Sequence, residues 1–181
     1  MDDVDAVIVT TPPHLHCEAS IAALDAGKHV FCQARMAMNF DEALKMYKKS
    51  LESDRVTMLC SGDDPGDIEM KALADSRFVG RPQNIIVKSM HPTYADADKP
   101  LHWRQMGDIS GLNTLDVGIY AEKIHSWFGY CRRVNAMAKH FIPERRVEGS
   151  KEMRKVDRPD SVVVVGELEN GALIEYHFSG V

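Results

Sequence analysis

Residues 4–43 read VDAVIVTTPPHLHCEASIAALDAGKHVFCQARMAMNFDEA. The stretch opens with an almost unbroken apolar run, residues 4–10, which is typical of a strand buried on both faces of a parallel sheet. Two prolines at positions 12–13 end that strand, because proline cannot donate a backbone hydrogen bond. Helix-forming residues then occupy about 15–26, and Gly27 is suited to end the helix, since glycine readily adopts the left-handed conformation of a C-cap.

The alternation of strand and helix continues beyond this helix. Residues 29–32 predict a second short strand, Asp41 predicts the cap of a second helix, and residues 56–60 predict a third strand. Strands separated by single helices run parallel and are joined by right-handed crossovers. Residues 1–80 are therefore predicted to form an α/β domain that resembles the C-terminal half of a Rossmann-like, doubly wound parallel sheet.

The pattern changes after residue 80. Four strands and one helix are predicted from here to the end of the chain: strands 83–90, 134–141, 161–167 and 172–178, and helix 116–128. The last two strands are joined through Asn170-Gly171, a pair that strongly favours a tight hairpin. Residues 81–181 are therefore predicted to be part of an α+β domain with a mostly antiparallel open sheet.

Composition excludes several classes of protein. The chain of 181 residues is 44% hydrophobic and 27% charged, with a formal net charge of -5 and no long run of one sign, which argues against a nucleic-acid partner. No apolar stretch approaches the roughly 20 residues needed to span a membrane, and the Met-Asp-Asp start is unlike a signal peptide. We therefore expect a cytoplasmic protein with four reduced cysteines. The cluster at His14, His16 and Cys17 fits no standard metal spacing, so no metal is expected.

A second motif, residues 102–129, reads HWRQMGDISGLNTLDVGIYAEKIHSWFG. Together with residues 4–43, and in the same order, this motif resembles the glucose–fructose oxidoreductase, inositol dehydrogenase and MocA (Gfo/Idh/MocA) family. The resemblance covers essentially the whole chain. It implies an N-terminal dinucleotide-binding domain, a C-terminal domain with a large open sheet, and hydride transfer between NAD or NADP and a carbon of a sugar or polyol. It also implies a homo-oligomer, because the open sheet commonly mediates assembly in this family.

The resemblance implies three sets of site residues. The catalytic set is Asp116 and Tyr120, the cofactor set is Thr10, Thr11, Pro12, His14 and Gln33, and the substrate set is His102, Trp103 and Arg104. Each set also has a purely structural interpretation. The first loop can be a helix-capping turn, Asp116 a helix cap, Tyr120 and Trp103 packing residues, and Arg104 half of a salt bridge.

The sequence departs from the family pattern in several places. No G-x-G-x-x-G loop for the cofactor phosphates occurs, and the chain ends just after a strand, so we interpret it as a fragment truncated at both ends. The family's Glu-Lys-Pro motif reads Gln33-Ala34-Arg35, which puts Ala34 in the place of the catalytic lysine, and Tyr120 takes the place of a histidine. Alanine cannot transfer a proton, so the activity of this chain is doubtful. Three hypotheses remain open: a degenerate oxidoreductase, a subunit completed by a partner chain, and a non-catalytic binding or oligomerisation module.

Overall fold

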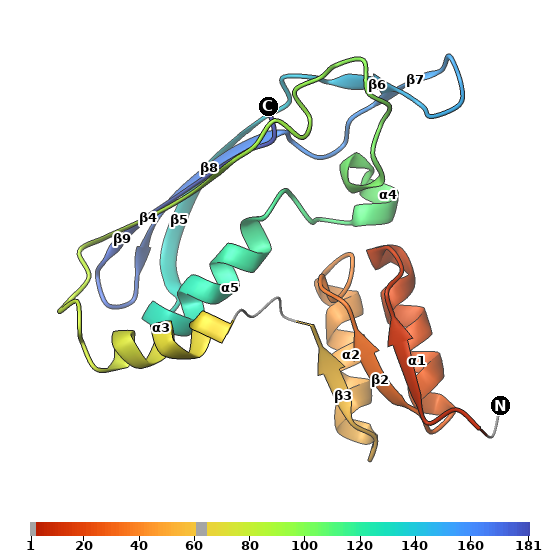
Figure 1. Ribbon diagram of the computed structural model, residues 1–181, viewed down its shortest axis with the longest axis horizontal. Helices are drawn as coiled ribbons and strands as arrows, with labels where there is room; N and C mark the ends of the chain where they lie inside the picture. The colour runs from red at the N-terminus through yellow and green to blue at the C-terminus, as the bar shows by residue number, and fades with distance from the viewer. Residues whose placement is uncertain (1–2, 61–64) are drawn as a thin grey trace. The chain divides into compact units, whose positions relative to one another are not determined.

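The computed structural model describes residues 3–60 and 65–181 (Figure 1). The chain divides into two compact units. The N-terminal unit comprises residues 1–62 and 106–113, and the C-terminal unit comprises residues 63–105 and 114–181. The sequence predicts a boundary between two domains at residue 80, and that boundary remains a prediction.

The N-terminal unit is built on three parallel strands. They are ordered β1 (Ala6–Val9), β2 (His29–Cys32) and β3 (Thr57–Leu59), with the 3-10 turn η1 (Pro13–Leu15) and helices α1 (His16–Asp25), α2 (Phe40–Glu52) and α4 (Gly107–Ser110). The predicted parallel α/β sheet is therefore confirmed. One face of the sheet packs on α1 and α2, where Val9, Val30 and Cys32 meet Leu24 and Met46 in a common core.

Two local predictions in this unit need correction. The first strand is not buried on both faces, because Ile8 is 69% exposed and only the face carrying Val9 is covered by helices of this unit. The cap of α2 is Asn39 and not Asp41. Asn39 has extended backbone and accepts a hydrogen bond from the Glu42 amide at 3.0 Å, while the Glu42 carboxylate accepts one from the Met38 amide at 3.1 Å. Such a reciprocal pair satisfies two amides that the helix itself leaves unbonded.

The C-terminal unit is built on a four-stranded mixed sheet. Its elements are α3 (Pro65–Asp75), β4 (Asn84–Met90), η2 (Trp103–Gln105), α5 (Val117–Phe128), β5 (Cys131–Lys139), β6 (Glu144–Arg146), β7 (Met153–Lys155), β8 (Ser161–Leu168) and β9 (Leu173–Ser179). The order is β4-β9-β8-β5, with β4 parallel to β9 and the other neighbours antiparallel, while β6 and β7 form a separate two-stranded ribbon. The predicted hairpin is present, with Gly171 at a φ of 86° in its turn.

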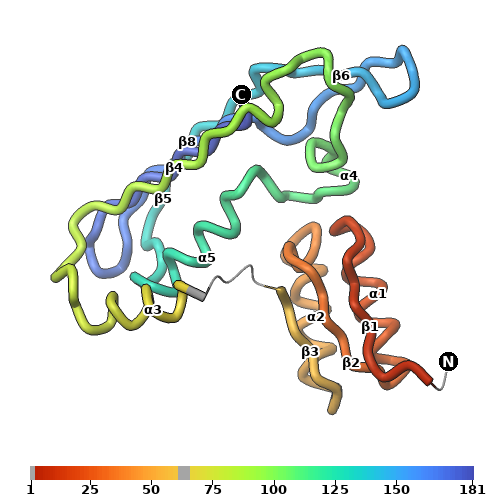
Figure 2. The backbone as a smooth tube through the Cα atoms, viewed as in Figure 1, coloured from red at the N-terminus to blue at the C-terminus, as the bar shows by residue number. Residues whose placement is uncertain are grey.

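The four-stranded sheet has one covered and one open face. Helix α5 runs along one face (Figure 2), where Ile124 of the helix meets Ile174, Tyr176 and Phe178 of β9. The alternate residues of the same strands point to the other face, as the two-residue period of a strand requires. Large apolar side chains remain exposed there: Ile86, Met90, Met137, Val165 and Leu173.

Candidate functional site

The predicted cofactor residues of the first two strands lie at one edge of the parallel sheet. Thr10 and Thr11 follow β1 and are exposed, and Gln33 follows the neighbouring strand β2 and is exposed as well. The backbone amide of Gln33 donates a hydrogen bond to the Val9 carbonyl at 2.9 Å, which continues the ladder of hydrogen bonds between the strands to this edge. Ligands of open α/β sheets bind beyond the carboxyl ends of the strands, and this is that edge.

Pro12 and His14 lie in the turn that leads from β1 to α1. Pro12 has extended backbone before η1, and its carbonyl accepts a hydrogen bond from the Leu15 amide at 3.1 Å. The His14 ring is partly buried, and its Nδ1 is a buried atom that has no hydrogen-bond partner among the described residues. This unsatisfied nitrogen is a polar group that a ligand at the strand edge could engage.

A residue outside the predicted sets joins the two strand ends. The His16 side chain is almost completely buried, at 1% exposure. Its Nε2 lies 2.5 Å from the Thr11 carbonyl oxygen, and its Nδ1 lies 2.8 Å from the Arg35 carbonyl oxygen. Sequence reasoning missed these contacts, because both partners are backbone carbonyls, which no residue type indicates.

Asp116 is the centre of a small polar cluster in the C-terminal unit. Its carboxylate lies directly before α5, is 38% exposed and makes no capping hydrogen bond to that helix. Its Oδ2 accepts a hydrogen bond from the Ser89 hydroxyl at 3.4 Å and lies 3.8 Å from Nε2 of His91, a ring that is 37% exposed. Sequence reasoning missed Ser89 and His91, because nothing along the chain shows that the end of β4 meets the start of α5.

Tyr120 lies one turn further along α5. Its amide donates to the Asp116 carbonyl at 3.2 Å, and its ring centroid lies 5.5 Å from that of Phe178. The ring is partly buried against the core of the unit. The Tyr120 side chain therefore packs against Phe178, independently of any role in proton transfer.

The three predicted substrate residues lie together in a short turn. The His102 and Trp103 ring centroids are 5.6 Å apart, and the Arg104 guanidinium lies 4.2 Å from the centroid of the Trp103 ring. Burial lowers the pKa of His102, and the nearby charge of Arg104 lowers it further, so His102 is neutral at pH 7. The position of the Arg104 guanidinium over the Trp103 ring makes this a cation–π contact rather than a salt bridge.

A buried arginine holds the loop that leads into this turn. The guanidinium of Arg145, which is 1% exposed, donates to the carbonyls of Asp96 at 2.6 Å and Lys99 at 3.3 Å, and also to that of Tyr94. Arg145 lies on β6, so this small ribbon fixes the backbone just before the substrate turn. Within the turn, the buried Gln105 accepts a hydrogen bond from the His102 amide at 3.1 Å.

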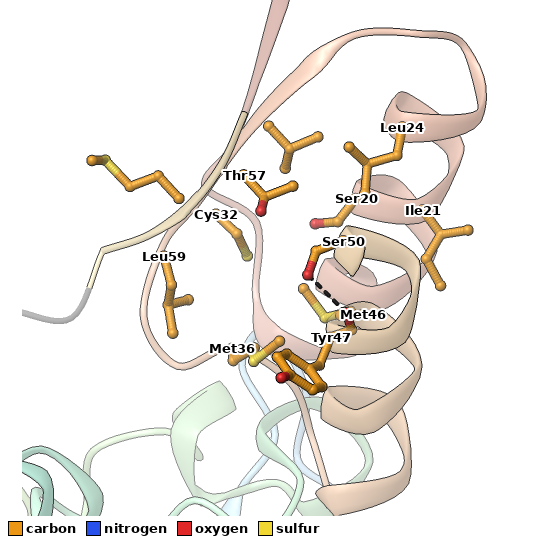
Figure 3. Close-up of a pocket in the computed structure, with 12 residues that line it drawn as sticks. Ser20, Ile21, Leu24, Cys32, Met36, Met46, Tyr47, Ser50, Thr57 and Leu59 are labelled. Carbon is orange, nitrogen blue, oxygen red and sulfur yellow. Dashed lines mark hydrogen bonds between the residues drawn. The ribbon is translucent and has the colours of Figure 1, made fainter. Parts of the chain in front are cut away.

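A separate pocket lies inside the N-terminal unit (Figure 3). It has a volume of about 210 Å³ and lies between α1, α2, β2 and β3, where apolar and sulfur-containing side chains such as Leu24, Cys32 and Met46 point into it. Burial raises the pKa of the Cys32 thiol. None of the predicted site residues lines this pocket.

Residues 3–60 and 65–181 show neither a metal-binding cluster nor a membrane-spanning helix. No group of three or more His, Cys, Asp or Glu side chains there could hold a metal ion. Within the same ranges, every helix is too short or too polar to cross a membrane.

The fold and these residues define a class of α/β protein. One unit has a parallel half-sheet with polar residues at the carboxyl ends of its strands, and the other has a mixed sheet and carries the Asp116 carboxylate. Comparison with known proteins gives the family. Residues 1–60 match the model of the oxidoreductase family with an NAD-binding Rossmann fold, and residues 68–181 match the model of the GFO/IDH/MocA C-terminal domain. The chain belongs to the Gfo/Idh/MocA family, as the two motifs predicted.

Individual relatives support this assignment. The chain is 28% identical to the levoglucosan dehydrogenase of Pseudarthrobacter phenanthrenivorans, over 94% of this chain and 48% of that enzyme. Its structure is similar to an oxidoreductase domain protein from Kribbella flavida, with a TM-score of 0.88, 26% identity, and 99% and 49% of the two chains covered. A levoglucosan dehydrogenase in complex with NADH and levoglucosan gives a TM-score of 0.85 at 28% identity, with 98% and 48% covered. The chain thus spans about half the length of the relatives it matches.

Proposed function

We propose that this chain takes part in NAD(P)-dependent hydride transfer to or from a carbinol carbon of a sugar or polyol. The observation that carries the proposal is the half-exposed carboxylate of Asp116, held at one oxygen by Ser89 and His91. Oxidation of a hydroxyl-bearing carbon releases a proton together with the hydride, so such a reaction needs a positioned base. The family match favours this function over a non-catalytic binding module.

The N-terminal unit fits the cofactor at its polar strand edge. Thr10, Thr11 and Gln33 offer exposed hydroxyl and amide groups there, and His14 adds a buried nitrogen that has no partner within residues 3–60 and 65–181. Bound NAD or NADP would supply the hydride acceptor. Threonine, glutamine and histidine side chains are suited to hydrogen-bond the uncharged nicotinamide and ribose groups.

In our proposal, the C-terminal unit handles the proton and the substrate. Asp116 accepts the proton of the reacting hydroxyl through the oxygen that faces away from Ser89 and His91, and Tyr120 lies one helical turn away as a second proton-transfer group. Nδ1 of the neutral His102 ring accepts a hydrogen bond from the Arg104 backbone amide at 3.2 Å, so Nε2 carries the proton and can donate to a sugar hydroxyl. Trp103 and Arg104 offer an aromatic face and a cation for further hydroxyl groups.

The segment at Gln33-Ala34-Arg35 contributes no proton in this scheme. Ala34 has only a methyl group, and arginine stays charged in proteins. Proton transfer therefore depends on the side chains of the C-terminal unit. We expect slower turnover than in relatives with a lysine here, by on the order of 10²–10⁴-fold for a lost acid–base group.

Two further features belong to the proposal. We infer a homo-oligomer from the open face of the mixed sheet, where Ile86, Met137 and Val165 are exposed, because such apolar patches commonly mark interfaces. We infer a cytoplasmic location because all four cysteines are free thiols rather than disulfides.

A turnover assay tests the proposed function. The purified chain is incubated with NAD⁺ or NADP⁺ and a panel of polyols that includes levoglucosan and myo-inositol, and absorbance of the reduced nicotinamide is followed. We expect slow turnover that Asp116→Asn lowers by about 10²-fold or more. Glu122→Gln removes an exposed carboxylate from the same helix and should leave the rate unchanged. Equal rates for Asp116→Asn and the unchanged chain would contradict the role of Asp116.

A further inference from the structure

The His16 ring makes two hydrogen-bonding contacts with different parts of the chain. Thr11 lies in the turn after β1, and Arg35 lies in the segment after β2. The ladder between these strands ends where the Gln33 amide meets the Val9 carbonyl. Beyond that bond, the two segments are next joined by the His16 side chain, within the part of the chain that the structure describes.

The two partners of the His16 ring limit the hydrogen bonds that it can make. Both partners are carbonyl oxygens, which only accept hydrogen bonds. A neutral imidazole carries one N–H group and can therefore donate to one of them only. A neutral ring can therefore hold one carbonyl by a hydrogen bond and lies against the other, whereas only a ring with a proton on each nitrogen could donate to both.

We propose that His16 is a positioning residue that clamps the two strand-end segments 10–12 and 33–35 together. Its meaning for catalysis rests on the proposed function, since these segments carry Thr10, Thr11 and Gln33. A histidine that only fills the core needs no more than one bond. The two contacts here fix backbone carbonyls on either side of the candidate cofactor edge, at 2.5 and 2.8 Å.

The first test reads the ring directly in the unmodified chain. Long-range ¹H–¹⁵N NMR of the labelled protein distinguishes one protonated ring nitrogen from two, and loss of the signals in His16→Gln assigns them. We expect a ring N–H group on His16 that exchanges slowly with water, as a hydrogen bond from a buried ring to a carbonyl requires. His29 is the internal control, because its Nδ1 accepts a hydrogen bond from the Val56 amide at 2.9 Å and must be unprotonated. A His16 ring N–H that exchanges freely with water would overturn the proposal.

The second test removes the clamp and follows the two segments. Amide hydrogen exchange is compared among the unmodified chain, His16→Gln and His29→Gln, and the variants are also titrated with NADH. We expect faster exchange of residues 10–12 and 33–35 and weaker NADH binding in His16→Gln alone. Where turnover is measurable, kcat/KM should fall by up to about 10²-fold, as expected for reacting groups displaced by about an ångström.

The outcomes separate the clamp from the proposed function. If the unmodified chain binds no NADH, the proposed function fails for this chain, and the exchange data still decide whether His16 holds the segments. Unchanged exchange in His16→Gln would overturn the clamp even if NADH binds. If His16→Gln does not fold, the ring protons of the unmodified chain decide the matter.

Discussion

The two polar regions of this molecule are built in opposite ways. At the strand edge of the N-terminal unit, Thr11 and Gln33 are exposed, while a buried histidine beneath them binds the backbone of both segments. At the start of α5, the polar group of interest, Asp116, is itself held by side chains, at the longer distances of 3.4 and 3.8 Å. In the first region the contacts are made to backbone carbonyls, whereas in the second they are made between side chains. Substitutions should therefore act on fold and binding in the first region, and on rate in the second.

The largest effect is expected where the backbone of the N-terminal unit is most closely packed. Gly111 has a φ of 64°, and a Cβ there would lie 2.2 Å from the Met38 carbonyl oxygen. Gly111→Ala should therefore destabilise the chain by about 3 kcal/mol or more, measured by urea denaturation. Gly118→Ala is the matched control. Its Cβ meets nothing within 4 Å inside α5, so it should be neutral or stabilising by about 0.5–1 kcal/mol. Equal stabilities of the two variants would show that Met38 yields easily.

The next largest effect is expected from a substitution that adds a proton-transfer group to the N-terminal unit. Ala34→Lys introduces a titratable amine into the segment beside Gln33, where the family resemblance implies a lysine. We expect turnover to rise by about 10²-fold, the lower end for one acid–base group. Ala34→Met, which has similar length and no titratable group, should give no gain. A gain with methionine would point to packing rather than proton transfer.

A smaller effect is expected from the side chains that hold Asp116. Ser89→Ala should lower kcat by about 10-fold and leave KM unchanged, because a hydrogen bond to a charged group contributes roughly 1.5 kcal/mol at the low end. His91→Gln should have a smaller effect of the same kind, because its ring lies 3.8 Å from the carboxylate, beyond hydrogen-bond distance. The rate is measured under saturating substrate. His177→Gln, on the same sheet, is the control. A change in KM with constant kcat would place these residues in substrate binding instead.

The smallest effect concerns Tyr176 in the core of the C-terminal unit. Its hydroxyl is buried without a hydrogen-bond partner among the described residues, and burial raises its pKa to about 12. An unfolded tyrosine ionises near pH 10, so the folded state binds the proton more tightly and stability falls as pH rises from about 10 to 12. Tyr176→Phe should remove this part of the alkaline loss and be neutral, or stabilising by up to about 1 kcal/mol, at pH 7. Denaturation at pH 7 and pH 11 measures both, and an identical pH dependence in both proteins would contradict the assignment.

Local patterns in the sequence predicted much of the fold. Apolar runs and the Asn170-Gly171 pair identified the parallel half-sheet and the hairpin, because burial and turn geometry act within a few residues. The ribbon of β6 and β7 was missed. Both strands are mostly charged, and their main buried residue is Arg145, whose partners are carbonyls far away along the chain.

The candidate site was less predictable than the fold. Family motifs identified Asp116 and the strand-edge residues, and their roles stay predictions. His16 was treated only as a possible metal ligand, because its two partners are backbone carbonyls and leave no signature in residue types. Ser89 and His91 carry no motif at all, and their position beside Asp116 depends on the packing of α5 against the end of β4.

The pairing of β4 with β9 has a consequence for the order in which the chain acquires its structure. Residue 84 pairs with residue 173, so the parallel pair of the mixed sheet closes a long loop, whereas β1, β2 and β3 join near neighbours along the chain. Long-range pairing carries a larger entropic cost before any contact compensates for it, and it slows folding. On the ribosome, the three parallel strands can assemble early, while β4 must wait with an unpaired apolar edge until β9 emerges. Of the two units, we therefore expect the C-terminal unit to complete its sheet later.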